Sequence, residues 1–404
     1  MKNHLNLLKY IFVLLTLTVG ACSGQTAQNQ NQRTASTNQN KIVGGGCDGC
    51  ELMFVGMPKE IESVDYSPGW TEKGQKLLVA GIVYKLDGQT PAPNVIIYYW
   101  QTDSNGYYSP KPEMDERAKR HGHIRGWVKS DENGKYSIYT IRPAPYPNRD
   151  IPAHIHLSIK EPNIANEYYI DEFVFDDDKL LIPAVKKNPS ENRGGSGVLR
   201  VLLKDDLQIA EHNIILGLNI PNYPEIVKSE KQSGLAIGED NPSFTPFHAW
   251  GADKGTRACP VCKYGRYHGI LYFVGNNPNW DEIKKWLVFL EQESVTRGKH
   301  LKTYFVYGNE SDYDKDERQK TLQTVGQELD LKNVALTFVP SFQDSESNVN
   351  LNKINPNLEN TIVVFRQRNI IAKYIDLKPS TENFKDISTA LDRSTSEYFN
   401  LQEL

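Results

Sequence analysis

From about residue 77 the apolar positions follow the short period of β-strands. Runs of apolar and β-branched residues recur at close spacing, separated by turn-rich segments such as DGQTPAP (87–93). This pattern predicts strands at 77–86, 94–101, 127–130, 135–141, 153–159, 168–175, 198–204 and 212–218. The sequence DENG (131–134) between the third and fourth runs predicts a hairpin. Short strands without helical periods are typical of an antiparallel β-sandwich or barrel, which we place at 46–220.

After Asn219 the pattern changes. A polar, proline-bearing connector (221–237) is followed by an apolar run at 269–275 that predicts a buried strand. An amphipathic helix is predicted over 279–294, with Asn279 as its N-cap and an apolar face of Trp280, Ile283, Leu287 and Leu290. Further elements are a strand at 302–308, a helix at 316–330, and strands at 334–340, 361–367 and 370–377. This order predicts an α/β domain with a partly parallel sheet at 238–404.

Residues 1–22 predict the cellular compartment. Lys2 and Lys9 flank the start, and the apolar run 11–19 is too short to span a bilayer as a mature helix. The segment 19–22 ends in Cys22 and resembles the lipobox of bacterial lipoproteins, in which that cysteine is acylated and anchors the chain in a membrane. Ser23 resembles the outer-membrane sorting pattern, with the periplasmic face and the cell surface both open. The alternative is a plain secretory signal cleaved near Ala21; both interpretations export the protein.

The segment between the signal and the strands has no apolar pattern. Residues 23–45 are rich in Gln, Asn, Thr and Ser, so we expect a disordered polar linker. The whole chain has 404 residues, of which 39% are hydrophobic, enough for two domains. Lys and Arg number 46 against 50 Asp and Glu, for a net charge of -4. With no basic excess to hold a phosphate backbone, we expect no nucleic-acid partner.

The strand predicted at 153–159 carries two histidines, His154 and His156. Residues i and i+2 of a strand face the same side, so the two imidazoles lie together while Ile155 faces away. Paired imidazoles suit Fe, Cu, Ni or Zn. An isolated H-x-H is more often an ordinary surface or core pair.

The neighbouring segments VIIYYWQTDSNGYYS (95–109) and ENGKYSIYTIRPAPYPNRDIPAHIH (132–156) make the pattern specific. From about residue 77 to 175 the chain resembles the intradiol ring-cleavage dioxygenases, the catechol and protocatechuate dioxygenases. Those enzymes hold a non-haem Fe(III) on a β-sandwich with two tyrosines and two histidines. The resemblance implies that the ligands and catalytic residues are Tyr108, Tyr146, His154 and His156. It also implies Fe(III) as cofactor, and a catechol-type aromatic and O2 as substrates of a cleavage that yields a muconate-type diacid.

Two positions depart from that family. An Arg usually precedes P-A-H-I-H, whereas this chain has Ile151, with Arg149 two residues earlier. The Gln that commonly partners this Arg aligns roughly with Asp171. The ligand set is therefore retained while the substrate-activating pair is changed. An acidic Asp171 in the pocket would disfavour a carboxylated ring such as protocatechuate.

Other polar and aromatic residues of this region have simpler interpretations. His121 and His123 lie in a charged loop and are expected to be solvated. Trp100 and Trp127 are expected in the core, and the acidic stretch 167–178 is expected to be a solvated edge.

Four of the five cysteines form two C-x-x-C pairs, Cys47/Cys50 and Cys259/Cys262. The element order after residue 238 resembles a thioredoxin-like domain, although the pair precedes the strand 269–275 and the residues after that strand, NNPNW, contain no cysteine. In an oxidising exported compartment two small disulfides are the default. Redox activity, a four-cysteine zinc site and electron exchange between the pairs remain alternatives.

Three functions are therefore compatible with the sequence. The first is the Fe(III) dioxygenase; the second is an exported binding or scaffold β-sandwich with the metal site structural or lost. The third is a thiol–disulfide protein acting through the C-terminal domain. Subunit association is common in the dioxygenase family and allows a homo-oligomer, but no apolar stripe in the sequence marks an interface.

Overall fold

The computed structural model describes residues 42–224, 231–311 and 313–403. The predicted signal peptide, Cys22 and nearly all of the predicted linker lie outside the described residues. Within the described ranges, no helix combines the length and the apolar character that crossing a membrane requires.

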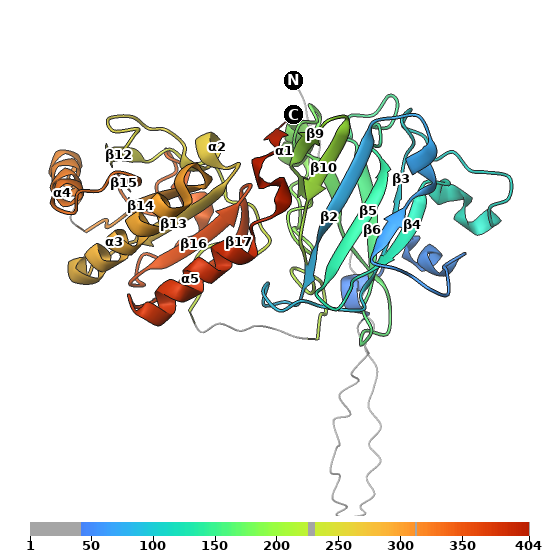
Figure 1. Cartoon of the computed structure of the whole chain (residues 1–404), viewed down its shortest axis with the longest axis horizontal. Helices are drawn as coiled ribbons and strands as arrows, with labels where there is room; N and C mark the ends of the chain where they lie inside the picture. Colours follow the sequence, from blue (N-terminus) through green and yellow to red (C-terminus); the bar gives the residue numbers. More distant parts are fainter. Residues whose placement is uncertain (1–41, 225–230, 312, 404) are drawn as a thin grey trace, which may run out of the picture. The chain divides into compact units, whose positions relative to one another are not determined.

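Two β-sheets pack face to face in the N-terminal half (Figure 1). The first has the order β1 (Val64–Tyr66), β5 (Lys135–Ile141), β2 (Lys76–Tyr84), β10 (Leu207–Glu211), β9 (Val201–Lys204) and β18 (Gln402–Glu403), with β11 (Ile214–Ile215) also on β2. The second has the order β4 (Arg125–Lys129), β3 (Ile96–Gln101), β6 (His154–Lys160), β7 (Tyr168–Phe175) and β8 (Val198–Leu199). One apolar core joins them, in which Val79 and Ile138 of the first sheet meet Ile97, Leu157 and Phe173 of the second. The predicted sandwich is confirmed.

The predicted hairpin at 131–134 is wrong. Asp131 does close a tight turn, since its Oδ1 accepts the backbone N–H groups of Asn133 and Lys135 at 2.8 Å each. However, β4 pairs with β3, whereas β5 pairs with β2 and β1 in the other sheet. Buried Val128 and Ile138 both belong to the core between the sheets. The turn therefore carries the chain from one layer to the other.

The sequence predicted an antiparallel sandwich, but the sandwich also contains parallel strand pairs. The pairs β1–β5, β2–β10, β2–β11 and β7–β8 are parallel. The apolar run 198–204 is divided at Arg200 into β8 and β9, which belong to different sheets. A helix, α1 (Leu181–Lys187), precedes β8. Short 3-10 turns are η1 (Val43–Gly45), η2 (Cys50–Phe54), η3 (Pro68–Thr71), η4 (Glu116–His121), η5 (Gly298–His300), η6 (Val349–Asn352) and η7 (Glu397–Asn400).

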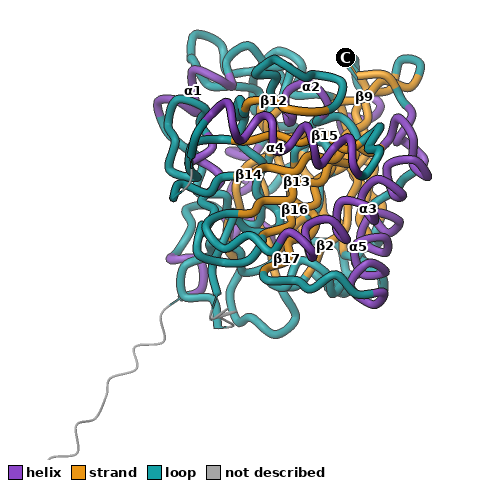
Figure 2. Tube along the Cα trace, turned by 90° about the vertical axis from the view of Figure 1, so that its left-hand side faces the viewer, coloured by secondary structure: helices purple, strands orange, loops and turns teal. Residues whose placement is uncertain are grey.

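The C-terminal half forms a six-stranded mixed sheet with helices packed on it (Figure 2). Its order is β12 (Phe247–Trp250), β15 (Val334–Phe338), β14 (Leu301–Tyr307), β13 (His268–Val274), β16 (Thr361–Arg366) and β17 (Asn369–Ile375). The helices are α2 (Pro260–Tyr264), α3 (Trp280–Arg297), α4 (Lys315–Glu328) and α5 (Thr381–Arg393). Strands β13, β14 and β15 are parallel and the remaining pairs antiparallel. The predicted β-α-β-α-β-β order is confirmed, whereas β12, α2 and α5 were not predicted.

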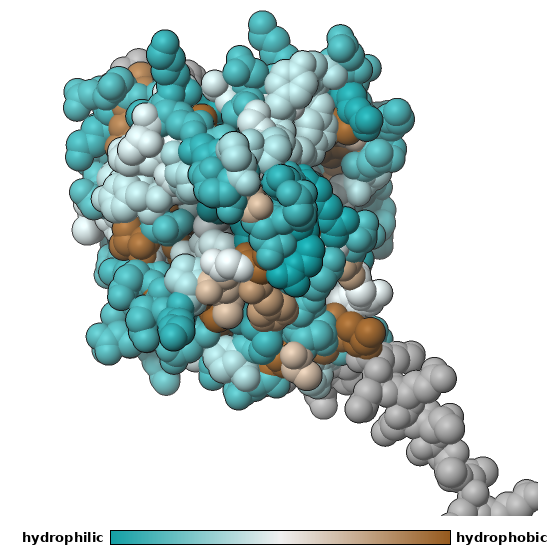
Figure 3. All heavy atoms as spheres, turned by 90° about the vertical axis from the view of Figure 1, so that its right-hand side faces the viewer, coloured by the Kyte–Doolittle hydropathy of each residue, from teal (hydrophilic) through white to brown (hydrophobic). Residues whose placement is uncertain are grey.

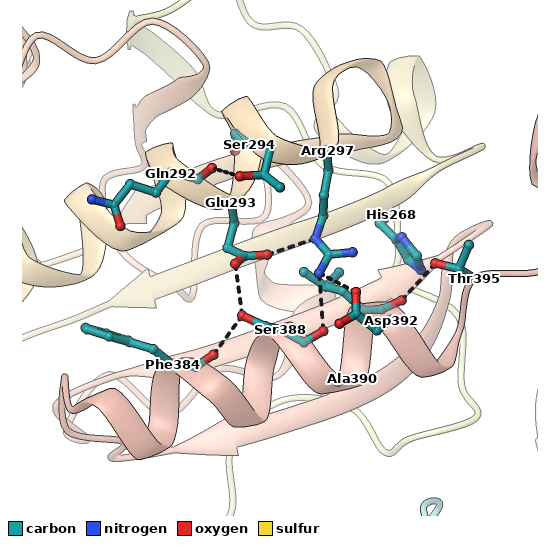
Figure 4. A network of polar contacts seen from close by, with 12 residues as sticks. His268, Gln292, Glu293, Ser294, Arg297, Phe384, Ser388, Ala390, Asp392 and Thr395 are labelled. Carbon is teal, nitrogen blue, oxygen red and sulfur yellow. Dashed lines mark hydrogen bonds and ion pairs between the residues drawn. The ribbon is translucent and has the colours of Figure 1, made fainter.

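Helices α3 and α5 are joined by a polar network (Figure 4). The predicted cap of α3 is confirmed, because the Asn279 side chain accepts the N–H of Glu282. At the other end, Arg297 donates to Glu293 at 2.8 Å and to Asp392 of α5 at 2.6 Å. Ser388 of α5 donates to the second oxygen of Glu293 at 2.9 Å. The network fixes the ends of both helices over their shared apolar core.

The predicted domain boundaries stay predictions, although the last described strand returns to the sandwich. β18 pairs antiparallel with β9, and Arg366 of β16 forms an ion pair with Glu211 of β10.

On the face shown in Figure 3, hydrophilic side chains dominate and hydrophobic ones lie in small separate groups. A homo-oligomer likewise stays a prediction.

Candidate active site

The structure brings the four predicted ligand residues together. The Tyr108 and Tyr146 Oη atoms lie 2.6 Å apart, and the Nε2 atoms of His154 and His156 lie 3.1 Å apart. Tyr108 Oη is 2.8 Å from His156 Nε2, and Tyr146 Oη is 3.0 Å from His154 Nε2 and 3.4 Å from His156 Nε2. Two histidines of one strand and two tyrosines of separate loops therefore point at one another.

The loop after β3 presents Tyr108 inward and Tyr107 outward. Asp103 closes a turn there, its Oδ1 accepting the N–H groups of Asn105 at 2.8 Å and Tyr107 at 3.1 Å. Its Oδ2 accepts the Ser109 hydroxyl at 2.7 Å. Tyr107 is 58% exposed, whereas Tyr108 is half-buried. Only one of the two adjacent tyrosines therefore faces the site.

The two tyrosine loops are bound to each other. Thr102 Oγ1 donates to the carbonyl of Ala144 at 2.8 Å, and the Ala144 N–H donates to the carbonyl of Asp103 at 3.1 Å. Gly106 has a φ of +86°, and a Cβ there would lie 2.2 Å from the carbonyl oxygen of Pro145. Only glycine permits this approach, which places the phenols of both loops side by side.

Each imidazole is oriented by a bond to its other nitrogen. His154 Nδ1 lies 2.8 Å from the carbonyl oxygen of Pro152, and His156 Nδ1 lies 3.2 Å from Glu172 Oε1 of β7. Because the carbonyl and the carboxylate are acceptors, both Nδ1 atoms carry the hydrogen and both Nε2 lone pairs face the tyrosines. Asp178 supports the start of β6 by accepting the N–H of Ala153 at 2.7 Å.

Burial shapes the electrostatics of this cluster. It raises the pKa of Tyr108, to which the hydrogen bond with Tyr146 adds, and it raises the pKa of Tyr146 as well. Burial lowers the pKa of His154, with the neighbouring His156 adding to the effect. For Glu172, burial favours the neutral form, but the hydrogen bond and charge of His156 outweigh it and leave the pKa below its ordinary value. Glu172 is therefore ionised at neutral pH beside two imidazoles.

Glu172 was not predicted as a site residue, and Asp171, which was considered for the pocket, is not the carboxylate beside the histidines. Asp171 accepts the hydroxyl of Ser190. Glu172 faces His156, and the ligand atoms of His154, His156 and Glu172 all lie within 4.8 Å of one another. The prediction of a solvated acidic edge holds for exposed Asp176 but is wrong for Glu172.

A stack of aromatic rings lies behind His156. Trp100 stacks on His156, with ring centroids 4.8 Å apart and an angle of 15° between the planes. It also stacks on His121, with ring centroids 4.2 Å apart and an angle of 2° between the planes. Tyr98 Oη lies 2.8 Å from His121 Nδ1. Trp100 is 7% exposed and Trp127 packs on the same cluster. The core placement of both tryptophans is confirmed, and Trp100 additionally contacts a site residue.

The predicted solvation of His121 and His123 is wrong. His121 is 5% exposed and His123 is 9% exposed. Burial lowers the pKa of His121 to about 3, with the charges of Arg125 and Arg120 adding to the effect. His123 Nε2 lies 2.7 Å from Glu72 Oε1. The polar sequence around His121 did not indicate its burial because the 3-10 turn η4 exposes Arg117 and Arg120 while His121 turns inward.

The four C-x-x-C cysteines form two disulfides, Cys47–Cys50 and Cys259–Cys262. Each sulfur is bonded within its own motif. The predicted pair of small disulfides is confirmed, and the four-cysteine zinc site is wrong for this state of the chain.

The donor set at Tyr108, Tyr146, His154 and His156 fits one first-row transition-metal ion. Bonds of about 2.0 Å to four tetrahedral donors would separate the donors by roughly 3.3 Å. The separations of 2.6–3.4 Å in the structure bracket that value. Anionic phenolate oxygens favour a hard trivalent ion such as Fe(III), and imidazoles bind iron well.

Comparison with known proteins finds similarity over this region. Residues 56–192 match the family model described as Dioxygenase. Catechol 1,2-dioxygenase of Acinetobacter baylyi is 26% identical over 168 residues, which are 35% of this chain and 53% of that protein. Hydroxyquinol 1,2-dioxygenase of Corynebacterium glutamicum is 30% identical over 136 residues, 34% of this chain and 40% of that protein.

Among solved structures, the dioxygenase domain of a dioxygenase carbohydrate-binding protein fusion from Streptomyces sp. SirexAA-E aligns with 40% of this chain and 91% of its own, at 19% identity and a TM-score of 0.31. The chain spans about half or less of the length of the two curated relatives named above. All four converging residues lie inside the matched range 56–192.

Proposed function

We propose that the β-sandwich is a non-haem Fe(III) intradiol dioxygenase that cleaves a catechol-type aromatic with O2 to a muconate-type diacid. The observation that carries the proposal is the convergence of two phenol oxygens and two imidazole nitrogens at separations of 2.6–3.4 Å. The match of residues 56–192 to a dioxygenase family model supports the reaction class.

Within this proposal, Tyr108, Tyr146, His154 and His156 hold the iron. When bound, Fe(III) supplies Lewis-acid chemistry that makes a catechol electron-rich enough to react with O2. The Pro152 carbonyl and Glu172 fix the imidazole tautomers.

Tyr146 is the site residue suited to move a substrate proton. It lies between exposed Pro145 and Pro147 in a loop that continues through exposed Arg149. Tyr108, by contrast, follows the turn closed by Asp103. The phenol of Tyr146 can therefore swing aside and accept a hydroxyl proton while the other three ligands stay in place.

The substrate-activating arginine of the dioxygenases has no counterpart at position 151, because the aliphatic side chain of Ile151 carries neither a charge nor a hydrogen-bond donor. Among the described residues, the carboxylate grouped with His154 and His156 is that of Glu172, so a ring that carries a carboxylate of its own would meet like charge. We therefore propose an uncharged or cationic catechol as the substrate class.

The proposal is tested by the visible spectrum and iron content of soluble protein beginning at Ile42. We expect about one iron per chain, a wine-red band from tyrosinate-to-Fe(III) charge transfer, and a shift of that band on adding catechol. Colourless protein that takes up no ferric iron would instead favour a non-catalytic binding or scaffold module.

Replacing Glu172 tests the support of His156. In Glu172→Gln the carboxylate bonded to Nδ1 is lost, and iron affinity should fall by about 10- to 100-fold. Competition with a ferric chelator measures this change. Asp171→Asn is the matched control, since Asp171 bonds Ser190 and is not grouped with His154 and His156 as Glu172 is. Equal iron affinity of Glu172→Gln and the wild type would show that Glu172 does not support iron binding by His156.

We also propose that the protein is exported and anchored through acylated Cys22, on the sequence pattern of residues 1–22 alone.

A thioredoxin-like C-terminal domain is proposed on the order of its elements. Central β13 has parallel β14 on one side and antiparallel β16 on the other, and α3 follows β13 directly.

A further inference from the structure

The second disulfide lies on a short helix with one buried and one exposed side. Pro260 and Val261 of α2 are buried, and Val261 packs in an apolar cluster with Leu271 and Phe273 of β13. Cys262 and Lys263 of the same helix are exposed. The packing of the buried side of α2 therefore keeps Cys262 at the surface.

The two sulfurs of this disulfide differ in their surroundings. Cys259 is half-buried against the apolar cluster, and its Sγ accepts the backbone N–H of Cys262 at 3.1 Å. The preceding carbonyl, that of Ala258, accepts a hydrogen bond at 2.8 Å from Nε2 of His248, which is 2% exposed. Cys259 is thus held in place and has a donor ready for a negative charge on its sulfur, because a hydrogen bond to a thiolate is stronger than one to a neutral sulfur.

The first disulfide has the opposite character. Cys50 is 1% exposed and Cys47 is half-buried. Asp48 and Glu51 beside them both pair with Arg120, at 3.3 and 3.1 Å. This disulfide fastens the segment that covers the aromatic stack behind His156, and it serves as an internal reference for the second one.

We propose that Cys259–Cys262 is a thiol–disulfide exchange site that accepts electrons from a dithiol of another exported protein, with Cys262 as the sulfur attacked. Exposure decides which sulfur a protein thiolate can reach. A protein dithiol is the fitting reductant because the redox potential of bacterial export compartments is not set by a buffer of small thiols such as glutathione. The C-x-x-C pair precedes the amino end of β13. The residues that follow the carboxyl end of this strand, Asn276–Asn279, contain no cysteine.

The exchange proceeds in two balanced steps. A partner thiolate attacks Cys262 Sγ, a partner–Cys262 disulfide forms, and the Cys259–Cys262 bond breaks with its electron pair on Cys259 Sγ, where the Cys262 N–H donates. The partner's second thiolate then attacks the partner sulfur of the mixed disulfide and releases Cys262 as a thiolate. The partner leaves as a disulfide, its two thiol protons pass through solvent to the cysteines, and two electrons have moved to this chain.

The first test compares the two disulfides within the purified full chain. The protein is equilibrated with increasing dithiothreitol, a model dithiol, then alkylated and its peptides are weighed. We expect Cys259 and Cys262 to be alkylated at a dithiothreitol concentration at least tenfold lower than Cys47 and Cys50. Equal midpoints, or earlier reduction of Cys47–Cys50, would overturn the proposal. The readout is independent of iron, so it can fail while the dioxygenase proposal stands.

The second test fixes the direction and the source of electrons. With a disulfide reagent, 5,5'-dithiobis(2-nitrobenzoate), the free Cys262 of Cys259→Ser should react at least tenfold faster than the free Cys259 of Cys262→Ser. The reverse order overturns the assignment of Cys262. A reduced C-x-x-C protein whose second cysteine is replaced by serine should form a trapped mixed disulfide with the oxidised wild-type chain, at Cys262 and not at Cys259 by peptide mass. Absence of that adduct, with dithiothreitol still effective, overturns the protein dithiol as reductant.

Discussion

Tyr146→Phe should lose ring cleavage on the order of a thousandfold, which corresponds to about 4 kcal/mol of transition-state stabilisation. The phenol oxygen lies within 2.6–3.4 Å of Tyr108, His154 and His156, so its removal takes one donor from the proposed ligand set. It also removes the group proposed to accept the substrate proton. Tyr146 is half-buried in a loop, so the fold should tolerate the change.

The measurement is O2 consumption with catechol, together with the charge-transfer band of the iron-loaded protein. The band should weaken and shift because one of two tyrosinates is missing. Tyr107→Phe is the matched control, since Tyr107 is 58% exposed next to Tyr108 and should keep both colour and activity. If Tyr146→Phe retained full O2 consumption, Tyr146 would be neither a required iron ligand nor the acceptor of the substrate proton.

The four candidate ligand positions were predicted from the resemblance to the intradiol dioxygenases, and local sequence explains part of their convergence. His154 and His156 share a strand face by their spacing alone, and the turn at Asp103 and Gly106 decides which tyrosine faces inward. Glu172 could not be predicted. The pairing of β6 with β7 shifts between Ile155 and Leu157, so strand alternation does not tell whether Asp171 or Glu172 faces His156.

The failures in the fold have a similar cause. An Asp131 turn has the same local bonds whether it joins neighbours in one sheet or crosses between two layers. The choice depends on which faces of β4 and β5 meet the core, and that is a property of strands distant in sequence. Burial of His121 likewise depends on Trp100 and Tyr98, which lie on another strand.

Acid should destabilise the protein through buried neutral histidines, of which His268 is the best placed to test. Burial lowers its pKa to about 3, with the positive charges of Arg366 and Arg297 adding to the effect. Its Nε2 donates to Ser394 Oγ at 2.7 Å, while that hydroxyl donates to the Ala390 carbonyl at 2.9 Å. The ring is therefore held neutral at the end of α5, in the region of Figure 4.

The folded pKa lies below the unfolded value of 6.5, so the unfolded chain binds the proton more readily. The resulting stability is complete above pH 6.5 and is lost as the pH falls toward 3. Between pH 7.5 and pH 5 this one group should cost about 2 kcal/mol of unfolding free energy.

His268→Gln isolates the effect, because a glutamine amide can still donate to Ser394 and carries no titrating charge. Urea unfolding followed by circular dichroism at pH 7.5 and pH 5 gives the unfolding free energy of both proteins. At pH 7.5 their difference reports the packing cost of the substitution alone. By pH 5 the wild type should have lost about 2 kcal/mol more than the variant, since all other titrating groups cancel in the comparison. Parallel pH profiles would mean that the ring of His268 is protonated in the folded protein at pH 5.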